Sequence, residues 1–459
     1  MNFIAAFLIG NIAYFGFAPT NLWIAPIISL YFLNRILKNG KTSTRLLIAQ
    51  LFGAGLLLPN QIWTGTYVGN LPWIILVFIQ SFLFWPFAIR IKKNCHLNSL
   101  LFASNAVVVE LLLRTVPFTG FGWSRLSFTQ TEGPLVRIFP LFGCAGVAFL
   151  MAFIAANRKI SAMLLVTLII SLSYLYHGNI LPEKQMKLAL VQGGVKNLGL
   201  DFNATPREVF ERHLQRTLSD IRPNQVDLII WPENSVDVDL FKYQDIKEAI
   251  SGASRKLGTP ILVGGITNSN GSLRNISVLF EPDPSQVYTK RYLTPFGEYI
   301  PIRKFVEKFS KLTNDVEDFS AGVQSNQIIL KDGSTQIFIC YELLNDSFKN
   351  EVNADFLTVQ TNNATFGDTA QLDQEQQIAQ VRAIETGRDV AYVSTTGITS
   401  FIDRNGRIKS ELPKFQSMVL FDTVDIYKDK QLNQKLSNLP EIISVFMVFF
   451  ILIWSRRSS

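Results

Sequence analysis

Apolar residues are concentrated in two parts of this chain, residues 1 to about 180 and a short stretch near the C-terminus. An α-helix needs about 20 mostly apolar residues to cross a bilayer, and several runs approach that length. The residues between the two parts show the mixed pattern of a globular domain. We therefore expect about eight membrane spans, at 1–17, 20–34, 46–63, 71–89, 99–113, 136–155, 161–177 and 440–454.

Basic residues follow every second predicted span, and this periodicity predicts an orientation. The loop after the third span, 64–70, carries no charge, and the loop after the fifth has only Arg114 and Arg125 as basic residues. Because basic loops stay in the cytoplasm, both termini should be cytoplasmic and residues 179–439 extracytoplasmic. The basic residues after the even-numbered spans are Arg35, Lys38, Lys41, Arg45, Arg90, Lys92, Lys93, Arg158, Lys159, Arg456 and Arg457.

The pattern predicts three parts: a membrane domain of seven spans at 1–178, an α/β domain at 179–439, and a last span with a cytoplasmic tail at 440–459. In the α/β domain, continuous apolar runs suit strands buried on both faces. Amphipathic helices are expected from Thr205, with Pro206 and Glu208 in a capping box, and over 370–385. The predicted strands lie at 188–193, 227–233, 261–267, 277–282, 337–342, 356–361 and 390–396.

Composition narrows the possible functions. The formal net charge is +7, but the basic residues are spread through short loops, which argues against nucleic-acid binding. Of the three cysteines, only Cys340 lies in the α/β domain, so no disulfide can form within it. A lone thiol in a non-cytosolic domain suggests reactivity, although a cysteine in an apolar strand is often inert core.

Two charged residues at strand ends are candidate partners for that thiol. Glu233 ends the run 227–233, and Lys290 follows a short run around Val287 and Tyr288. Position alone leaves both open as ordinary surface residues. A thiol nucleophile needs a proton acceptor and a nearby positive charge. The domain's only histidine, His213, lies mid-helix, so a glutamate in a partly apolar pocket is the better candidate base.

At these residues the sequence resembles a known family. WPEN at Glu233, YTKRYLTPFGEYIP at Lys290 and ICYE at Cys340 resemble the Glu–Lys–Cys motifs of the carbon–nitrogen hydrolase (nitrilase) superfamily. With the polytopic N-terminal half, the match is to its membrane-bound branch, the apolipoprotein N-acyltransferases. RAIETGR (382–388) and PLFGCAGVAFL (140–150) are also similar to that branch.

The resemblance implies a four-layer αββα sandwich joined to eight spans in the bacterial inner membrane. It implies transfer of a fatty acyl group from a phospholipid to the α-amino group of a diacylglyceryl-cysteine in an apolipoprotein, through a thioester. The residues that it implies are Cys340 as nucleophile, Glu233 as base and Lys290 as oxyanion stabiliser together with the N–H of Tyr341. It also implies Glu298, Tyr341 and Glu342 as supporting residues.

Two stretches depart from the family pattern. GVKNLGLDF (194–202) lacks a tryptophan that is common in the family after this strand, and TNNATFG (361–367) stands where TNDAWFG is common. These changes put the choice of substrate in question more than the reaction class. Phe118, Phe121 and Trp123, in the loop 116–132, are expected either to form a lateral lipid entrance or to belong to an interfacial aromatic belt.

Other functions remain open from the sequence alone. One is a membrane-tethered amidase or nitrilase that hydrolyses a small amide. Another is a non-catalytic scaffold for a polyprenol-phosphate glycosyltransferase. We expect a monomer and no cofactor or metal, because no metal-ligand cluster, phosphate-binding glycine loop or dinucleotide fingerprint is present in the sequence.

Overall fold

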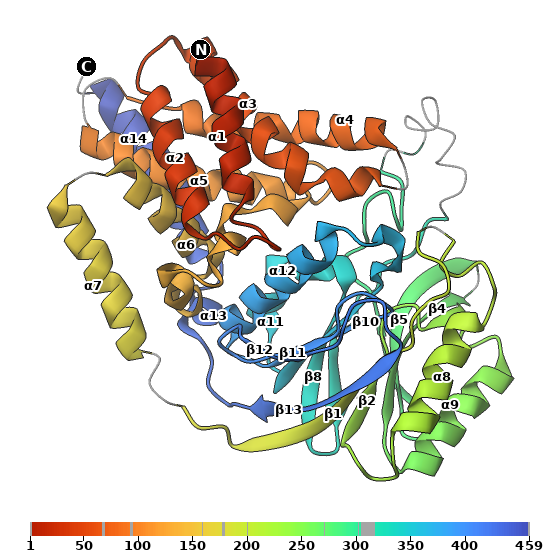
Figure 1. Cartoon of the computed structure of the whole chain (residues 1–459). Helices are drawn as coiled ribbons and strands as arrows, with labels where there is room; N and C mark the ends of the chain where they lie inside the picture. The colour runs from red at the N-terminus through yellow and green to blue at the C-terminus, as the bar shows by residue number, and fades with distance from the viewer. Residues whose placement is uncertain are drawn as a thin grey trace. The chain divides into compact units, whose positions relative to one another are not determined.

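The computed structural model describes residues 2–66, 69–91, 95–157, 159–176, 180–199, 201–269, 271–301, 303 and 317–457. The chain divides into two compact units (Figure 1). Unit 1 comprises Met1–Ile180, Asp373–Thr386 and Lys430–Ser459, and unit 2 comprises Leu181–Leu372 and Gly387–Asp429. Lys92, Lys93 and Arg158, on which the predicted orientation partly depends, lie outside the described residues.

Unit 1 is helical, and each predicted span corresponds to a helix. Four helical segments are long and apolar enough to cross a membrane among the residues described: Asn70–Ala88, His96–Thr115, Pro134–Ala156 and Leu439–Arg457. Asn2–Tyr14, Ile24–Ile36 and Met163–Tyr174 are apolar but shorter. The helices that correspond to the predicted spans are α1 (Asn2–Tyr14), α2 (Ile24–Ile36), α3 (Thr42–Asn60), α4 (Asn70–Ser81) with the 3₁₀ helix η2 (Phe82–Ala88), α5 (Cys95–Thr115), α6 (Phe139–Ala156), α7 (Ile160–Tyr176) and α14 (Leu439–Arg457).

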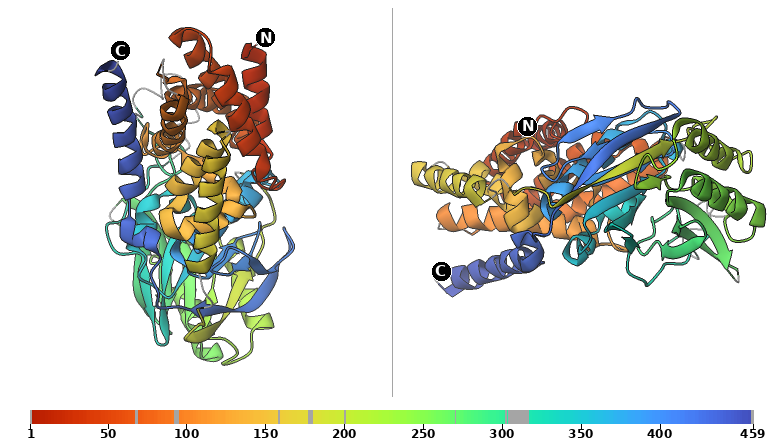
Figure 2. Two further views of the ribbon diagram at one scale, coloured as in Figure 1. Left: turned by 90° about the vertical axis from the view of Figure 1, so that its left-hand side faces the viewer. Right: turned by 90° about the horizontal axis from the view of Figure 1, so that it is seen from below.

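Helices α1 and α3 lie side by side at very short range (Figure 2). Glycine makes this possible. A Cβ added at Gly10 would lie 2.1 Å from the carbonyl oxygen of Phe52, and one added at Gly55 would lie 2.1 Å from that of Phe7. Small residues at such crossings let helix backbones approach closely, which is how apolar helices pack when burial of apolar surface supplies little driving force.

Helix α6 is interrupted, and a helix from far along the chain meets it there. Gly143 has φ 61° and ψ −165° inside α6, which leaves the N–H of Cys144 without its usual helical acceptor. That N–H donates to Oε1 of Glu385 at 2.9 Å. Glu385 lies on α12 (Ala370–Thr386), whose residues 373–386 belong to unit 1. The two family-like stretches 140–150 and 382–388 therefore meet at one hydrogen bond.

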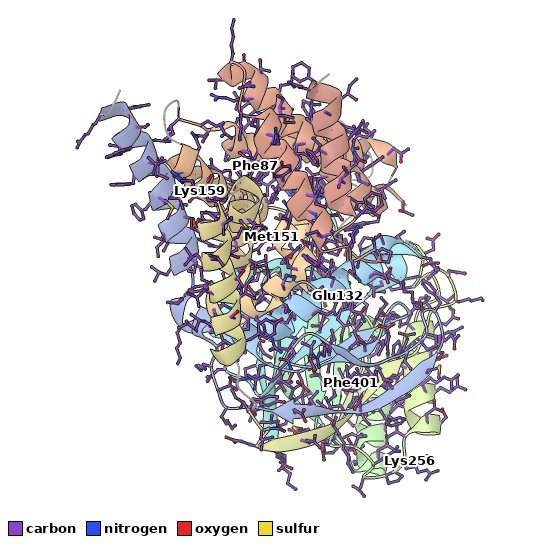
Figure 3. All side chains as sticks on the ribbon, turned by 60° about the vertical axis from the view of Figure 1, so that its left-hand side comes forward. Phe87, Glu132, Met151, Lys159, Lys256 and Phe401 are labelled. Carbon is purple, nitrogen blue, oxygen red and sulfur yellow. The ribbon has the colours of Figure 1, made fainter. Side chains whose placement is uncertain are left out.

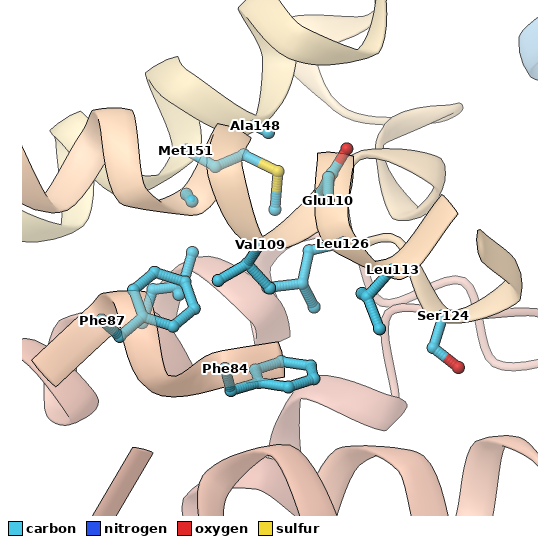
Figure 4. Close-up of a pocket in the computed structure, with 11 residues that line it drawn as sticks. Phe84, Phe87, Val109, Glu110, Leu113, Ser124, Leu126, Ala148 and Met151 are labelled. Atoms are coloured by element: carbon cyan, nitrogen blue, oxygen red, sulfur yellow. The ribbon is translucent and has the colours of Figure 1, made fainter. Parts of the chain in front are cut away.

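The loop 116–132 contains both exposed and buried aromatic residues. Phe118 is exposed, whereas Trp123 is buried and its Nε1 donates to Oε1 of Gln374 on α12 at 2.6 Å. Trp123 thus packs inside unit 1. Arg125 forms a buried ion pair with Glu110, which also lines a small, mostly apolar pocket with Ser124 (Figure 4).

Unit 2 contains two β-sheets. In the first the strand order is β13-β1-β2-β4-β5-β6, with β3 beside β4, and in the second it is β12-β11-β10-β9-β8-β7. The strands are β1 (Lys184–Gln192), β2 (Leu228–Ile230), β3 (Val236–Asp239), β4 (Ile261–Ser269), β5 (Ser272–Phe280), β6 (Pro284–Thr289), β7 (Gln327–Leu330), β8 (Gly333–Ile339), β9 (Phe356–Thr361), β10 (Val390–Ser394), β11 (Ser400–Ile402), β12 (Ile408–Glu411) and β13 (Met418–Ile426).

The two sheets pack face to face. One apolar core joins residues from both sheets, among them Leu190, Ile339 and Phe401, and Figure 3 labels Phe401 within the sandwich. A second core joins the outer face of the first sheet to α8 (Glu208–Asp220) and α9 (Gln244–Leu257). On the outer face of the second sheet, Phe338 contacts Phe348 of α11 (Asp346–Glu351). The helix–sheet–sheet–helix order agrees with the sandwich that the resemblance implied.

Most predicted elements of this unit are confirmed, but the start of its first helix is not. Strand β9 matches its predicted range, and α12 differs from its prediction by one residue. Helix α8, however, begins at Glu208 and not at Thr205, because Arg207 adopts a left-handed conformation with φ 70°. Pro206 therefore lies before the helix, and the predicted capping box does not form.

Candidate active site

The three residues singled out in the sequence come together in unit 2. Glu233 follows β2, Lys290 follows β6 in the same sheet, and Cys340 follows β8 in the other sheet. Nζ of Lys290 lies 3.4 Å from Oε1 of Glu233. Lys290 also interacts electrostatically with the Cys340 thiol. The site is thus built where strands of both sheets end.

Lys290 is a buried cation held between carboxylates. Its side chain is 1% exposed, and its Nζ lies 2.8 Å from Oε2 of Glu298. Burial lowers the pKa of Lys290, but Glu298, Glu233 and Cys340 raise it more strongly, so the pKa lies well above its usual value. The ammonium group is therefore charged at every physiological pH.

Glu233 is buried and both of its carboxylate oxygens are hydrogen-bonded. Oε1 accepts from Nδ2 of Asn275 at 2.7 Å, and Oε2 accepts from the backbone N–H of Asn362 at 3.0 Å. The side chain of Thr395 donates to the backbone oxygen of Glu233 at 2.9 Å. Hydrogen bonds of this kind favour an ionised carboxylate, which is the form that can accept a proton.

Cys340 occupies a sharp turn between β8 and the 3₁₀ helix η7 (Cys340–Leu344). Its φ is 49°, in the left-handed region that residues with a side chain rarely adopt. Such a conformation persists only where surrounding contacts impose it, and it is frequent at functional sites. The strand was predicted to continue through Cys340, but it ends at Ile339, and the turn leaves the thiol half-buried.

Glu342 holds this turn in place. Its Oε2 accepts from the N–H of Ile339 at 2.9 Å, next to Cys340. Its Oε1 accepts from the hydroxyl of Tyr288 and from the N–H groups of Arg291 and Tyr292, at 2.7, 2.7 and 3.1 Å. Burial raises the pKa of Glu342 to about 7, against the lowering effect of these donors. One side chain thus joins the Cys340 turn to the segment that carries Lys290.

Replacing Glu342 with glutamine should impair the site without removing any reacting group. The glutamine amide can accept hydrogen bonds at its oxygen only, so its NH₂ group would face one set of the present donors. Either the hydrogen bond to Ile339 or those to the segment before and after Lys290 should therefore be lost. We expect a lower rate of Cys340 chemistry. Rates of the two proteins, compared on folded samples with matched circular dichroism spectra, would check this. An unchanged rate would show that Glu342 does not position Cys340.

Glu342 should also make stability depend on pH. Its native pKa, about 7, lies above the ordinary value of 4.5, so the native state binds more protons than the unfolded state between these values. The contribution of this group to stability therefore falls as pH rises from about 4.5 to about 7. Thermal unfolding measured across this window should show a smaller decline for Glu342→Gln than for the unmodified chain.

Tyr341 adjoins the nucleophile, whereas His213 is a packing residue of α8. Tyr341 is half-buried after Cys340, and burial and the neighbouring Tyr299 raise the pKa of its phenol, while Lys290 opposes them. His213 is buried on α8, with its Nε2 accepting from the N–H of Gly193 at 3.1 Å. Burial lowers the pKa of His213 to about 4. A neutral histidine used in packing agrees with its exclusion as a base.

The two stretches that depart from the family pattern lie against each other beside Glu233. The N–H of Gly199 donates to the carbonyl of Ala364 at 2.8 Å. The backbone N–H of Asn362, in the same stretch as Ala364, donates to Oε2 of Glu233. The two stretches are therefore in contact, and 361–367 adjoins the site.

Sequence reasoning missed Asn275 and Asn362. Asn275 lies on β5 and its Nδ2 contacts both Glu233 and Glu298. Nothing in the run NISVLF distinguishes this asparagine from a solvated strand residue. Asn362 acts through its backbone, which no side-chain pattern reveals. Among the described residues, no group of three or more His, Cys, Asp and Glu side chains could hold a metal ion.

The site can support attack by a thiol on a carbonyl carbon. A half-buried cysteine, a hydrogen-bonded carboxylate and a permanent cation lie around one point, and histidine is not among them. The carboxylate can accept the thiol proton, and the cation can stabilise both a thiolate and an oxyanion. This chemistry is shared by acyl transfer and amide hydrolysis.

Comparison with known proteins matches both parts of the chain. The carbon–nitrogen hydrolase family model matches residues 187–431, and the model of the apolipoprotein N-acyltransferase N-terminal domain matches residues 9–157. An apolipoprotein N-acyltransferase of Wigglesworthia glossinidia brevipalpis is 28% identical and the match covers 97% of each chain. One of Mycolicibacterium smegmatis is 29% identical over 93% of this chain and 80% of its own.

Among solved structures, a CN-hydrolase superfamily protein of Xanthomonas campestris superposes with a TM-score of 0.40 and 18% identity, over 57% of this chain and 97% of that one. The family model alone spans more than half of the chain. The chain belongs to the carbon–nitrogen hydrolase family, in the branch of the apolipoprotein N-acyltransferases.

Proposed function

We propose that this protein transfers a fatty acyl group from a membrane phospholipid to the α-amino group of an S-diacylglyceryl-cysteine at the N-terminus of an apolipoprotein. The observation that supports this most is the Glu233–Lys290–Cys340 cluster in a chain whose N-terminal half matches N-acyltransferases. That match favours acyl transfer over hydrolysis of a small amide, and the intact cluster favours catalysis over a scaffold role.

The first half-reaction forms a thioester. Glu233 accepts the proton of the Cys340 thiol, and the sulfur attacks the ester carbonyl of the phospholipid. Lys290, with the N–H of Tyr341, stabilises the oxyanion of the tetrahedral intermediate. The C–O bond then breaks, Glu233 returns the proton to the leaving alkoxide, and a lysophospholipid departs.

The second half-reaction forms an amide. The uncharged α-amino group of the acceptor attacks the thioester carbonyl while Glu233 accepts one of its protons. The C–S bond breaks, and the proton passes to the Cys340 sulfur. Because the donor product must leave before the acceptor reacts, the kinetics should be ping-pong. Glu298 holds Lys290 in place, and Glu342 holds the Cys340 turn.

A membrane-embedded enzyme suits lipid substrates. Moving an acyl chain from the bilayer into water costs about 0.8 kcal/mol per methylene. We infer a multi-pass protein of the bacterial inner membrane with eight spans, both termini in the cytoplasm and a catalytic domain at 179–439 on the extracytoplasmic side. Its membrane part comprises 1–178 and the span in 440–459. We infer that it acts as a monomer.

The proposal is tested by an acyl-transfer assay with the full-length protein in detergent or vesicles. Phospholipid with a labelled acyl chain and a diacylated lipopeptide are the substrates. We expect labelled triacylated lipopeptide and parallel double-reciprocal plots. Release of free fatty acid from the phospholipid, or of ammonia from simple amides, with no acylated lipopeptide, would support hydrolysis and contradict the proposal.

A further inference from the structure

Asn275 is a buried amide between the two carboxylates of the site, and the reaction steps above give it no role. It lies on β5 and is 3% exposed. Its Nδ2 donates to Oε1 of Glu233 at 2.7 Å and to Oε1 of Glu298 at 2.8 Å. The two N–H bonds of an amide lie in one plane at a fixed angle, so this group sets the orientation of both carboxylates at once.

The orientation of the amide is imposed by these two partners. Oδ1 of Asn275 is buried and has no hydrogen-bond partner among the residues that the structure describes. An unpaired buried carbonyl is unfavourable, so the two hydrogen bonds that Nδ2 donates must outweigh its cost. Rotation would place Oδ1 at about the same distances from two carboxylate oxygens, which repel it. Oδ1 of Asn275 is therefore left unpaired because Nδ2 of the same amide donates to two carboxylates.

The same residue also holds Lys290. The backbone N–H of Lys290 donates to the backbone oxygen of Asn275 at 2.9 Å, where β6 ends beside β5. Asn275 thus contacts the base, the supporting glutamate and the cation. As a neutral donor it stabilises ionised carboxylates and adds no second cation that would compete with Lys290 for Glu233.

We propose that Asn275 is a positioning residue that keeps the Glu233 carboxylate ionised and correctly oriented to accept the proton of Cys340. The inference rests on the proposed function only in taking Cys340 as the nucleophile. The role of Asn275 concerns how readily the Cys340 thiolate forms, so it can be tested without a lipid substrate. The titratable groups that meet at this point are Lys290 after β6, Glu298 in the next turn, and Cys340 and Tyr341 after β8.

The test is the rate of alkylation of Cys340 by iodoacetamide as a function of pH. The full-length protein is used in detergent, and the labelled Cys340 peptide is quantified by mass spectrometry. For Asn275→Ala we expect the rise in rate to move to higher pH by about one unit, because the ionised base loses a donor. Asn275→Asp should move it further, because a third carboxylate joins the cluster.

Ser277→Ala is the matched control. Ser277 lies on the same strand and face and is fully buried, and within the described part of the chain its hydroxyl has no hydrogen-bond partner. Removing this hydroxyl shortens a buried side chain of β5 but leaves both carboxylates untouched, so the alkylation profile of Ser277→Ala should match that of the unmodified chain. Asn275→Ser, which keeps a single donor, should give an intermediate shift and serves if Asn275→Ala does not fold.

The outcomes separate the two proposals. A folded Asn275→Ala or Asn275→Ser protein with an unchanged profile would overturn the role of Asn275, whatever the acyl-transfer assay shows. A shift in a protein that transfers no acyl group would support Asn275 and contradict the proposed function. An equal shift in Ser277→Ala would assign the effect to general loosening of β5, and would also overturn the inference.

Discussion

Replacing Cys340 with alanine will abolish acyl transfer, and the acyl-enzyme will vanish with it. If the sulfur forms the thioester, no other group in the site can substitute, because the neighbouring Glu233 is a base and Lys290 remains protonated. Loss of a covalent nucleophile commonly reduces turnover by several orders of magnitude, here to below detection. The measurement is labelled acyl transfer, together with mass spectrometry of enzyme incubated with phospholipid alone.

Cys144 provides the matched control for this experiment. It is a buried cysteine of α6, outside the site. Cys144→Ala should keep both transfer and the acylated Cys340 peptide. Acylation detected at another residue in Cys340→Ala, or transfer that continues in this variant, would show that the thioester route is wrong.

Replacing Lys290 with methionine will cost both activity and stability. The cation lies between two buried carboxylates, at 3.4 Å from Glu233 and 2.8 Å from Glu298. Removing one partner of a buried ion pair typically destabilises a protein by about 3–5 kcal/mol, because the remaining charge is uncompensated. Loss of an oxyanion-stabilising group typically lowers turnover by about 10²–10³-fold. Thermal unfolding and single-turnover rates measure the two effects.

A second substitution separates these two effects. In the double variant Lys290→Met with Glu298→Gln, one buried negative charge is removed along with the cation. Stability should recover in part, whereas the rate of Cys340 acylation should stay low. If the rate recovered along with stability, Lys290 would act only by holding the fold together, and its proposed contact with the oxyanion would be wrong.

Motifs and apolar runs in the sequence predicted the central strands of the two sheets better than the strands at their edges. Strands β9 and β10 are fully buried, so their continuous apolar runs are distinctive. Strand β12 lies at a sheet edge and alternates little, with three of its four residues exposed, so it was missed. Strand β13 was also missed, because most of its residues are only half-buried. Its partner β1 lies at the other end of the domain's sequence, so no local pattern reveals the pairing.

The site shows the same limit. Glu233, Lys290 and Cys340 were predicted because their residue types suggest chemistry and their motifs resemble a family. Asn275 was not, because a single polar residue in a strand gains meaning only when the chain brings two carboxylates to it. The positive φ of Cys340 was not predicted either, since Glu342 holds this turn partly through contacts with Tyr288 and Arg291, which come from a distant part of the sequence.

The break in α6 has a consequence for biosynthesis. The N–H of Cys144 receives its acceptor from Glu385, a residue 241 positions later in the chain. An amide with no partner in an apolar environment costs several kcal/mol, so α6 leaves the ribosome incomplete. Its final form requires that the chain be synthesised through Leu372 of unit 2 and on to Glu385 of α12. Truncations that end before α12 should therefore yield a membrane half that proteases remove, even though every helix up to α7 is present.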